Sequence, residues 1–541
     1  MTIRVPVDLR RLPWIRRLAA DYTHDFAPLA PFFAGNPAES AAWQAAIARA
    51  QQADRPRADI AAALIDQQRR HGAPAAAIAA AEQLRDVRTV AVVTGQQAGL
   101  FGGPLYTLLK ALTAIRLAAE VRRAHEVPAV PIFWIESEDH DWDEVATCWV
   151  LDGELERRPV ALPSLPGANH APVAAVALKG AGGQAIETLR EALPPNEFTP
   201  ALLDGLRASY ADDVTMSAAF ARWMLRTLGE HGLVVYDAAD PATKPFLRGI
   251  FAREIAEPGR TSALAAEAGR QLVERGYHAQ VVPGEDSVAL FHLDGTREPV
   301  HRAAGGLLVG TTRRSQDDLL KELDARPAAF SPNVLLRPIV QDALFPTVAY
   351  VPGPNELAYL AQLRGVYERF GVPMPLMAPR ASATLLDAAA MRFLTKTGLA
   401  FETLERNDEG VLNWLLEQQL PASVEGGWQE AAAALTKHMD ALIQAVPLID
   451  ATLEGAARSA LGRMKHDLDV LHEKIVHAAK RRDDTLRRQF AHVRALAFPG
   501  GAPQERAVGF VYFLNRYGPA LVERLIADLP LDAGNHWILS I

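Results

Sequence analysis

A glycine-rich segment, Thr94–Thr107, carries the residues best suited to holding an anion. It reads Thr-Gly-Gln-Gln-Ala-Gly-Leu-Phe-Gly-Gly-Pro-Leu-Tyr-Thr, which has neither the Gly-Lys-Ser/Thr ending of a P-loop nor a G-x-G-x-x-G fingerprint. Backbone N–H groups between Gly95 and Gly103 could hold a phosphate or an oxyanion, and Gln96 and Gln97 could hydrogen-bond a ligand. The alternative is that the glycines only shape a tight turn.

A second polar cluster, Glu138-Asp139-His140-Asp141, has the residue types needed for proton transfer. Asp139 or Glu138 could bind an ammonium group, and His140 could remove a proton from an amine, since an unperturbed imidazole titrates at about pH 6.5. A solvated strand end or a helix N-cap is the structural alternative. Zinc or manganese ligation is a further alternative, but no second histidine stands at ligand spacing, so we predict no metal.

Other polar residues could bind substrate. Arg337 and Arg380 could hold a carboxylate or phosphate through the planar guanidinium, although each could equally form a structural ion pair. Asn355 and Glu356 follow Pro-Gly-Pro at a helix start, where capping competes with contact to a ribose. Cys148 has no activating partner in the sequence, so we do not expect it to be a nucleophile.

These residues lie on elements typical of a doubly wound α/β sheet. A strand at Thr89–Val93 precedes the glycine-rich segment, a helix at Leu105–Arg122 follows it, and a second strand covers Ala129–Ile135. In such a βαβ unit both strands end at the same edge of the sheet, where ligands bind. We therefore expect the two polar clusters to face a common hollow. Later strands are expected at Gly232–Asp237 and Met374–Met377.

The chain divides by composition into three parts. Residues 1–385 are expected to form a Rossmann-like catalytic core, with insertions near 146–210 and 280–330 and a helix at Glu356–Phe370. Residues 386–500 have apolar side chains at heptad spacing on two arms separated by Pro447, which predicts a helical hairpin. The stripe includes Leu442, Leu471 and Ile475. Residues 501–541 are expected to pack back on the core.

Composition narrows the class of protein. The 541 residues are 49% hydrophobic with a net charge of −8, which favours two or three full-sized domains and gives no reason to expect nucleic acid. The single cysteine cannot form an internal disulfide, and we see no signal peptide or membrane span. We therefore predict a cytoplasmic protein.

Six strings resemble the cysteine-adding ligase family of bacillithiol biosynthesis. They occur in order over nearly the whole chain, and their length argues against chance agreement. The strings are Thr94–Phe101, Gly103–Thr107, Glu138–Asp141, Ser331–Pro338, Pro379–Ser382 and Phe513–Gly518.

The resemblance implies a core similar to class I aminoacyl-tRNA synthetases and nucleotidyltransferases, with a coiled coil that makes a homodimer. It also implies that L-cysteine is joined to the amino group of glucosaminyl-malate, with ATP or ADP as the bound nucleotide. Leu109 stands before Lys110 where the family has histidine, which puts a catalytic histidine there in doubt. The His-Ile-Gly-His and Lys-Met-Ser-Lys-Ser signatures of the synthetases are absent, and Pro379–Ser382 occupies the place expected for the second.

We therefore predict a ligase that acts through an activated cysteine carboxylate. The alternatives are another ATP-dependent amino-acid ligase or adenylate-forming enzyme, a metal-dependent hydrolase using Glu138–Asp141, and a nonenzymatic adaptor. The predicted catalytic residues are Glu138, Asp139, His140, Asp141 and Lys110. The predicted nucleotide contacts are Gly95, Gln96, Gln97, Gly99, Gly103, Tyr106, Arg380 and Ser382. The predicted substrate contacts are Arg337, Asn355 and Glu356.

Overall fold

A five-stranded parallel sheet forms the core of the protein. The computed structural model describes residues 4–406, 410–417, 422–482 and 484–541. The spatial order β13-β12-β2-β3-β6 runs outward in both directions from β2. This is the order of a doubly wound Rossmann-like sheet, which confirms the predicted fold class. The strands are β2 (Val90–Gln97), β3 (Ala129–Glu136), β6 (Val234–Asp237), β12 (Thr347–Tyr350) and β13 (Leu376–Met377).

Helices cover both faces of this sheet, which is why its strands are apolar throughout. Ala91 and Val93 of β2 join one core cluster, and the intervening Val90 and Val92 join another. The helix α5 (Leu105–His125) connects β2 to β3 and packs with α2 (Ser40–Gln52) against Val90 and Val92. The opposite face is covered by α1 (Arg17–His24), α3 (Arg57–Arg70) and α4 (Ala75–Gln83).

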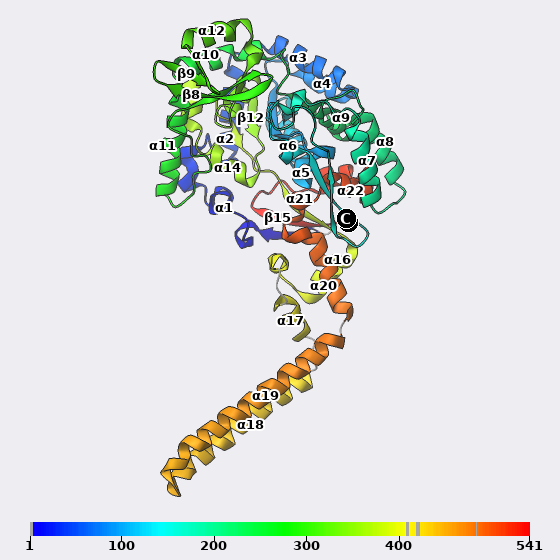
Figure 1. Cartoon of the computed structure of the whole chain (residues 1–541), viewed down its shortest axis with the longest axis vertical. Helices are drawn as coiled ribbons and strands as arrows, with labels where there is room; N and C mark the ends of the chain where they lie inside the picture. The colour runs from blue at the N-terminus through cyan, green and yellow to red at the C-terminus, as the bar shows by residue number, and fades with distance from the viewer. Residues whose placement is uncertain (1–3, 407–409, 418–421, 483) are drawn as a thin grey trace. The chain divides into compact units, whose positions relative to one another are not determined.

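Two regions interrupt the parallel sheet along the sequence. The first, after β3, contains a β-hairpin and a group of helices in which α8 packs between α7 and α9 (Figure 1). Its elements are α6 (Trp142–Val145), β4 (Thr147–Leu151), β5 (Arg157–Ala161), α7 (Ala181–Ala192), α8 (Thr199–Ser209) and α9 (Met216–Leu228).

The second region forms a separate antiparallel sheet in the order β10-β9-β8-β7-β11. Its strands are β7 (Ser287–Asp294), β8 (Thr296–Ala303), β9 (Gly306–Val309), β10 (Thr312–Arg314) and β11 (Phe330–Pro332). The helices around it are α10 (Arg248–Ala256), α11 (Arg260–Glu274) and α12 (Gln316–Ala325).

The predicted helix over Glu356–Phe370 is wrong as one element. The chain forms α14 (Pro354–Leu360) and α15 (Arg364–Phe370), preceded by α13 (Arg337–Leu344). The buried Gln362 lies between α14 and α15, and its side chain bonds the backbone of Ala265, Gln280 and Val281. These bonds fix the turn that separates the two helices.

The first and last strands that the structure describes pair in a further small sheet. Its strand order is β1-β15-β14, formed by β1 (Arg4–Asp8), β15 (Asn535–Ser540) and β14 (Ser382–Leu386). One compact unit therefore comprises residues 1–385 and 502–541. The helices α21 (Gln504–Ala507), α22 (Phe510–Tyr517) and α23 (Ala520–Asp528) belong to it.

Residues 386–501 form a second compact unit made of helices. Within it α18 and α19 lie side by side as a long hairpin (Figure 1). The seam differs from the predicted stripe, because Ile443 and Val476 are buried while Leu442, Leu471 and Ile475 are exposed. The helices are α16 (Ala388–Thr397), α17 (Gly410–Glu417), α18 (Ala422–Ala445), α19 (Glu454–Arg482) and α20 (Asp484–Ala497).

No helix in the described ranges is long and apolar enough to cross a membrane.

Candidate functional site

A cavity of about 650 Å³ opens where β2, β3 and β12 end. This is the switch point of the sheet, where the chain order reverses and open α/β sheets bind their ligands. Its lining includes ten of the sixteen residues predicted for the site, namely Gly95, Gln96, Gln97, Tyr106, Lys110, Asp139, Arg337, Asn355, Glu356 and Arg380. The other six, Gly99, Gly103, Glu138, His140, Asp141 and Ser382, do not line it.

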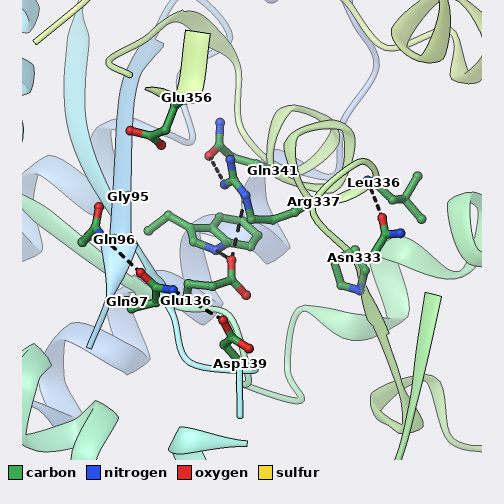
Figure 2. Close-up of polar contacts among 12 residues, drawn as sticks. Gly95, Gln96, Gln97, Glu136, Asp139, Asn333, Leu336, Arg337, Gln341 and Glu356 are labelled. Atoms are coloured by element: carbon green, nitrogen blue, oxygen red, sulfur yellow. Dashed lines mark hydrogen bonds and ion pairs between the residues drawn. The ribbon is translucent and has the colours of Figure 1, made fainter. Parts of the chain in front are cut away.

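The end of β2 brings two glutamine side chains to the cavity (Figure 2). The amide of Gln96 donates to Gln97 Oε1 at 3.0 Å and to the Tyr106 hydroxyl at 3.3 Å. Gln97 Nε2 donates to Glu144 Oε2 at 2.5 Å and lies 3.5 Å from Asp139 Oδ2. Gln97 at the end of β2 and Asp139 after β3 therefore meet in one hollow, whereas the rest of the acidic cluster does not line it.

The glycine turn itself does not form the expected anion cradle. The N–H groups of Gly99, Gly102 and Gly103 donate to the carbonyls of Gln97, Gly99 and Leu100 within the turn. Gly102 has φ +95°, and a Cβ there would lie 2.1 Å from a ring carbon of Phe510. The turn is thus closed on itself and packed beneath α22, which supports the reading of these glycines as turn-formers.

Lys110 is buried, and its ammonium group has a partner for each of its three N–H donors. Its ammonium bonds Gly95 O at 2.6 Å, Gln96 Oε1 at 3.3 Å and Glu356 Oε2 at 2.5 Å, which occupies its three donors. Burial alone would raise the pKa of Glu356, but Lys110 holds it below its ordinary value. Glu356 also accepts the Gly353 N–H at 2.6 Å and the Tyr350 hydroxyl at 2.9 Å. Lys110 and Glu356 therefore tie β2 to the start of α14.

The four residues of the acidic cluster point in different directions. Glu138 is buried in an ion pair with Lys244, 2.5 Å away, and burial raises the pKa of Glu138 to about 7. Asp141 caps α6 by accepting the Glu144 N–H at 3.1 Å. These contacts give Glu138 and Asp141 structural roles, so their predicted catalytic roles are not supported by this geometry.

Asp139 and His140 are joined by an arginine that comes from the antiparallel sheet. Arg297, on β8, donates to Asp139 Oδ1 at 2.8 Å and lies 3.4 Å from His140 Nδ1. Its guanidinium stacks on Phe291, 3.9 Å from the ring centre. His140 is partly exposed. Arg297 therefore holds His140 together with Asp139, which lines the cavity.

A carboxyl and a guanidinium that line the cavity, those of Glu136 and Arg337, face each other (Figure 2). Glu136, the last residue of β3, accepts the Trp134 indole N–H at 3.1 Å, and burial raises the pKa of Glu136. Arg337 Nε lies 3.9 Å from Glu136 Oε2, and the guanidinium donates to Gln341 at 3.0 Å and Tyr359 at 3.3 Å. These bonds leave N–H groups of Arg337 available to a ligand.

Arg380, predicted as a phosphate contact, is instead neutralised within the protein. Its guanidinium forms a two-point ion pair with Glu505, at 2.6 and 2.8 Å, and both side chains are buried. Ser382 lies behind this pair, 3.0 Å from Glu505 and 2.7 Å from His536 Nδ1. The pair leaves little charge for a phosphate, so we assign Arg380 and Ser382 to support of the cavity wall.

Sequence reasoning missed several lining residues, chiefly Glu136, Glu144, Arg297, Asn333, Tyr350, Tyr359 and Arg506. Glu136 and Tyr350 could have been found, because each ends a strand at the functional edge. Arg297 and Arg506 carried no local signal. Within the described residues, no group of three or more His, Cys, Asp or Glu side chains is placed to hold a metal ion.

A Rossmann-like sheet with a charged cavity at its switch point places the protein among the doubly wound α/β proteins. Two family models together match almost the whole chain: "Bacillithiol biosynthesis BshC, N-terminal Rossmann-like domain" over residues 6–381 and "Bacillithiol biosynthesis BshC, C-terminal coiled-coil domain" over residues 383–541. The chain belongs to the BshC family of bacillithiol biosynthesis, and the resemblance found in the sequence is confirmed.

Three relatives that align with this chain over nearly their full lengths carry the name "Putative cysteine ligase BshC". The Salinibacter ruber protein is 36% identical to this chain, and the alignment covers 97% of this chain and 96% of the relative. The Koribacter versatilis protein is 34% identical, with 96% of each chain covered. The Geobacillus kaustophilus protein is 32% identical, with 98% of each covered.

Proposed function

We propose that the protein is a ligase that joins the carboxyl group of L-cysteine to the amino group of glucosaminyl-malate. The observation that carries this proposal is the pairing of Arg337 with Glu136 in the cavity, 3.9 Å apart. A site for this acceptor must hold carboxylates and an amine close together, because malate and the amino group occupy neighbouring carbons of the sugar. The name of the BshC relatives, "Putative cysteine ligase BshC", supports a ligase that uses cysteine.

The malate end of the acceptor is assigned to Arg337. Its guanidinium is held by Gln341 and Tyr359 and lies near the faces of Trp134 and Tyr350. An arginine fixed in this way can offer two parallel N–H groups to one carboxylate. Asn355 lines the same cavity and is proposed as a further contact to the substrate.

The amino group is assigned to the carboxylates at the end of β3. Glu136 and Asp139 would hold it as an ammonium ion, and His140, beside Asp139, would take its proton. The neutral amine then attacks the activated carboxyl carbon, the new C–N bond forms, and the oxygen leaving group departs with its electron pair. The amine must lose one further proton, which the same group can accept after it has released the first to water.

ATP is proposed as the source of activation, since it can convert a carboxylate into a reactive acyl group. Gln96, Gln97 and Tyr106 would contact the nucleotide from the cavity wall. The closed glycine turn does not fit a phosphate. We also propose that the protein is cytoplasmic and that a homodimer forms through the α18–α19 hairpin, where Leu442, Leu471 and Ile475 remain exposed.

Incubation of the purified protein with L-cysteine, glucosaminyl-malate and ATP tests the reaction. Mass spectrometry should detect the amide product together with a nucleotide product. Glucosamine in place of glucosaminyl-malate is the matched control for the Arg337 assignment. Product formed without any nucleotide would refute the activation step, and absence of the amide under all conditions would refute the ligase.

A further inference from the structure

The short helix α21 is locked against β14 by two buried side chains. Gln504 pairs with the backbone of Leu385, accepting its N–H at 2.8 Å and donating to its carbonyl at 2.9 Å. Glu505 is held by Arg380 and also accepts from Ser382. The next residue, Arg506, is therefore presented to the cavity from a rigid base.

Arg506 is exposed and lines the cavity at the end that holds Tyr106. Burial and Glu144 raise the pKa of Tyr106, and the positive charges of Arg506 and Arg380 oppose that rise. The Arg506 guanidinium makes no hydrogen bond or ion pair with the residues that the structure describes. Arg506 lines the cavity, and no carboxylate among the described residues forms an ion pair with it.

The lack of an ion-pair partner distinguishes Arg506 from the other cationic side chains that line the same cavity. Each of the others lies within 4 Å of a carboxylate, in the pairs Lys110–Glu356, Arg297–Asp139, Arg337–Glu136 and Arg380–Glu505. A guanidinium without such a partner binds carboxylate or phosphate oxygens through charge-assisted hydrogen bonds. The cavity therefore has a vacant anion-binding group at its Tyr106 end.

We propose that Arg506 binds an anionic group of a substrate in this cavity. The anion is a nucleotide phosphate or a carboxylate of the acceptor, and its identity rests on the proposed function. The C-terminal segment thus contributes a substrate contact to a site otherwise built from the first 385 residues. Gln504 and Glu505 are positioning residues, because they fix the helix that carries Arg506.

Direct binding to the full-length protein tests this role without requiring turnover. Calorimetric titrations with ATP and with glucosaminyl-malate would compare the parent protein with Arg506→Ala and Arg506→Lys. Arg524→Ala is the matched control, because Arg524 is an exposed arginine on α23 that does not line the cavity. We expect Arg506→Ala to weaken one ligand about 10- to 100-fold, the range typical of a lost charged hydrogen bond, and Arg506→Lys to weaken it less.

The ligand whose affinity falls in Arg506→Ala identifies the anionic group that Arg506 binds. A loss confined to ATP supports a phosphate contact, a loss confined to glucosaminyl-malate supports a carboxylate contact, and a loss for both supports an anion position that the two share. Affinities within twofold of Arg524→Ala for both ligands would overturn the proposal. A weakening accompanied by a lower melting temperature than that of Arg524→Ala would also overturn it. Failure of the ligase reaction would leave these titrations unaffected.

Discussion

Replacing Glu505 with glutamine removes the carboxylate that neutralises buried Arg380. The pKa of Glu505 is lowered from 4.5 to about 2: burial would raise it, but the charge and hydrogen bonds of Arg380 outweigh that effect. At 1.36 kcal/mol per pH unit, this difference corresponds to about 3 kcal/mol of stability at pH 7. Breaking a buried ion pair on one side typically costs about 3–5 kcal/mol, so both routes give a similar loss.

The pH dependence has a definite sign. Because the pKa of Glu505 is lower in the folded protein, its stabilisation is complete above pH 4.5 and is lost as the pH falls toward 2. We expect the difference in unfolding free energy between the parent protein and Glu505→Gln to fall from about 3 kcal/mol at pH 7 to about 1 kcal/mol at pH 3.

This difference can be measured by unfolding each protein in urea and monitoring hydrogen exchange in peptides from β14 and α21. These peptides report on the unit that contains the Arg380–Glu505 pair. Glu523→Gln is the control, because Glu523 is an exposed carboxylate of the same segment. The control should change stability by less than about 0.5 kcal/mol. A difference below about 1 kcal/mol at pH 7, or one that is unchanged at pH 3, would refute the assignment of the pair.

Three further predictions concern the cavity and the turn. His140→Ala and Asp139→Asn should abolish product while light scattering shows an unchanged oligomer; normal turnover in both would remove the pair from the mechanism. Arg337→Lys should raise the KM for glucosaminyl-malate about 10- to 100-fold with little change in that for cysteine, and equal changes would contradict the assignment. Gly102→Ala should lower the free energy of unfolding by about 2–4 kcal/mol in urea titrations, because the new Cβ meets Phe510 at a positive φ, whereas Gly153→Ala, in open space, should not.

The sheet could be predicted from the sequence because the residue patterns that specify its strands are local. Apolar runs at Val90–Val93 and Ala129–Ile135, with glycine between them, specify two strands and a crossover, and the edge at which they end follows from parallel pairing. The common hollow followed from that geometry. The hairpin arms were also predictable, but the heptad stripe did not fix which side chains would face the α18–α19 seam.

The roles of single residues were harder to predict from the sequence, because each role depends on partners that are distant in the chain. Asp139 contacts Arg297 across 158 residues and Arg380 contacts Glu505 across 125, and neither pairing has a sequence pattern. Glu138 was predicted, as an alternative to Asp139, to bind an ammonium group, yet the loop turns it toward Lys244. Adjacent side chains in a loop can point in different directions. The proximity of Glu138 and Asp139 in the sequence therefore did not imply that they share a role.

The small β1-β15-β14 sheet has a consequence for synthesis of the chain. β1 holds residues 4–8 and pairs with β15 at residues 535–540, so it cannot pair until those residues have been synthesised. Arg380 likewise stays without Glu505 until the helical unit of residues 386–501 has left the ribosome. A chain lacking residues 502–541 would therefore expose the unpaired edges of β1 and β14 and would leave Arg380 without its carboxylate partner. Unpaired strand edges favour aggregation.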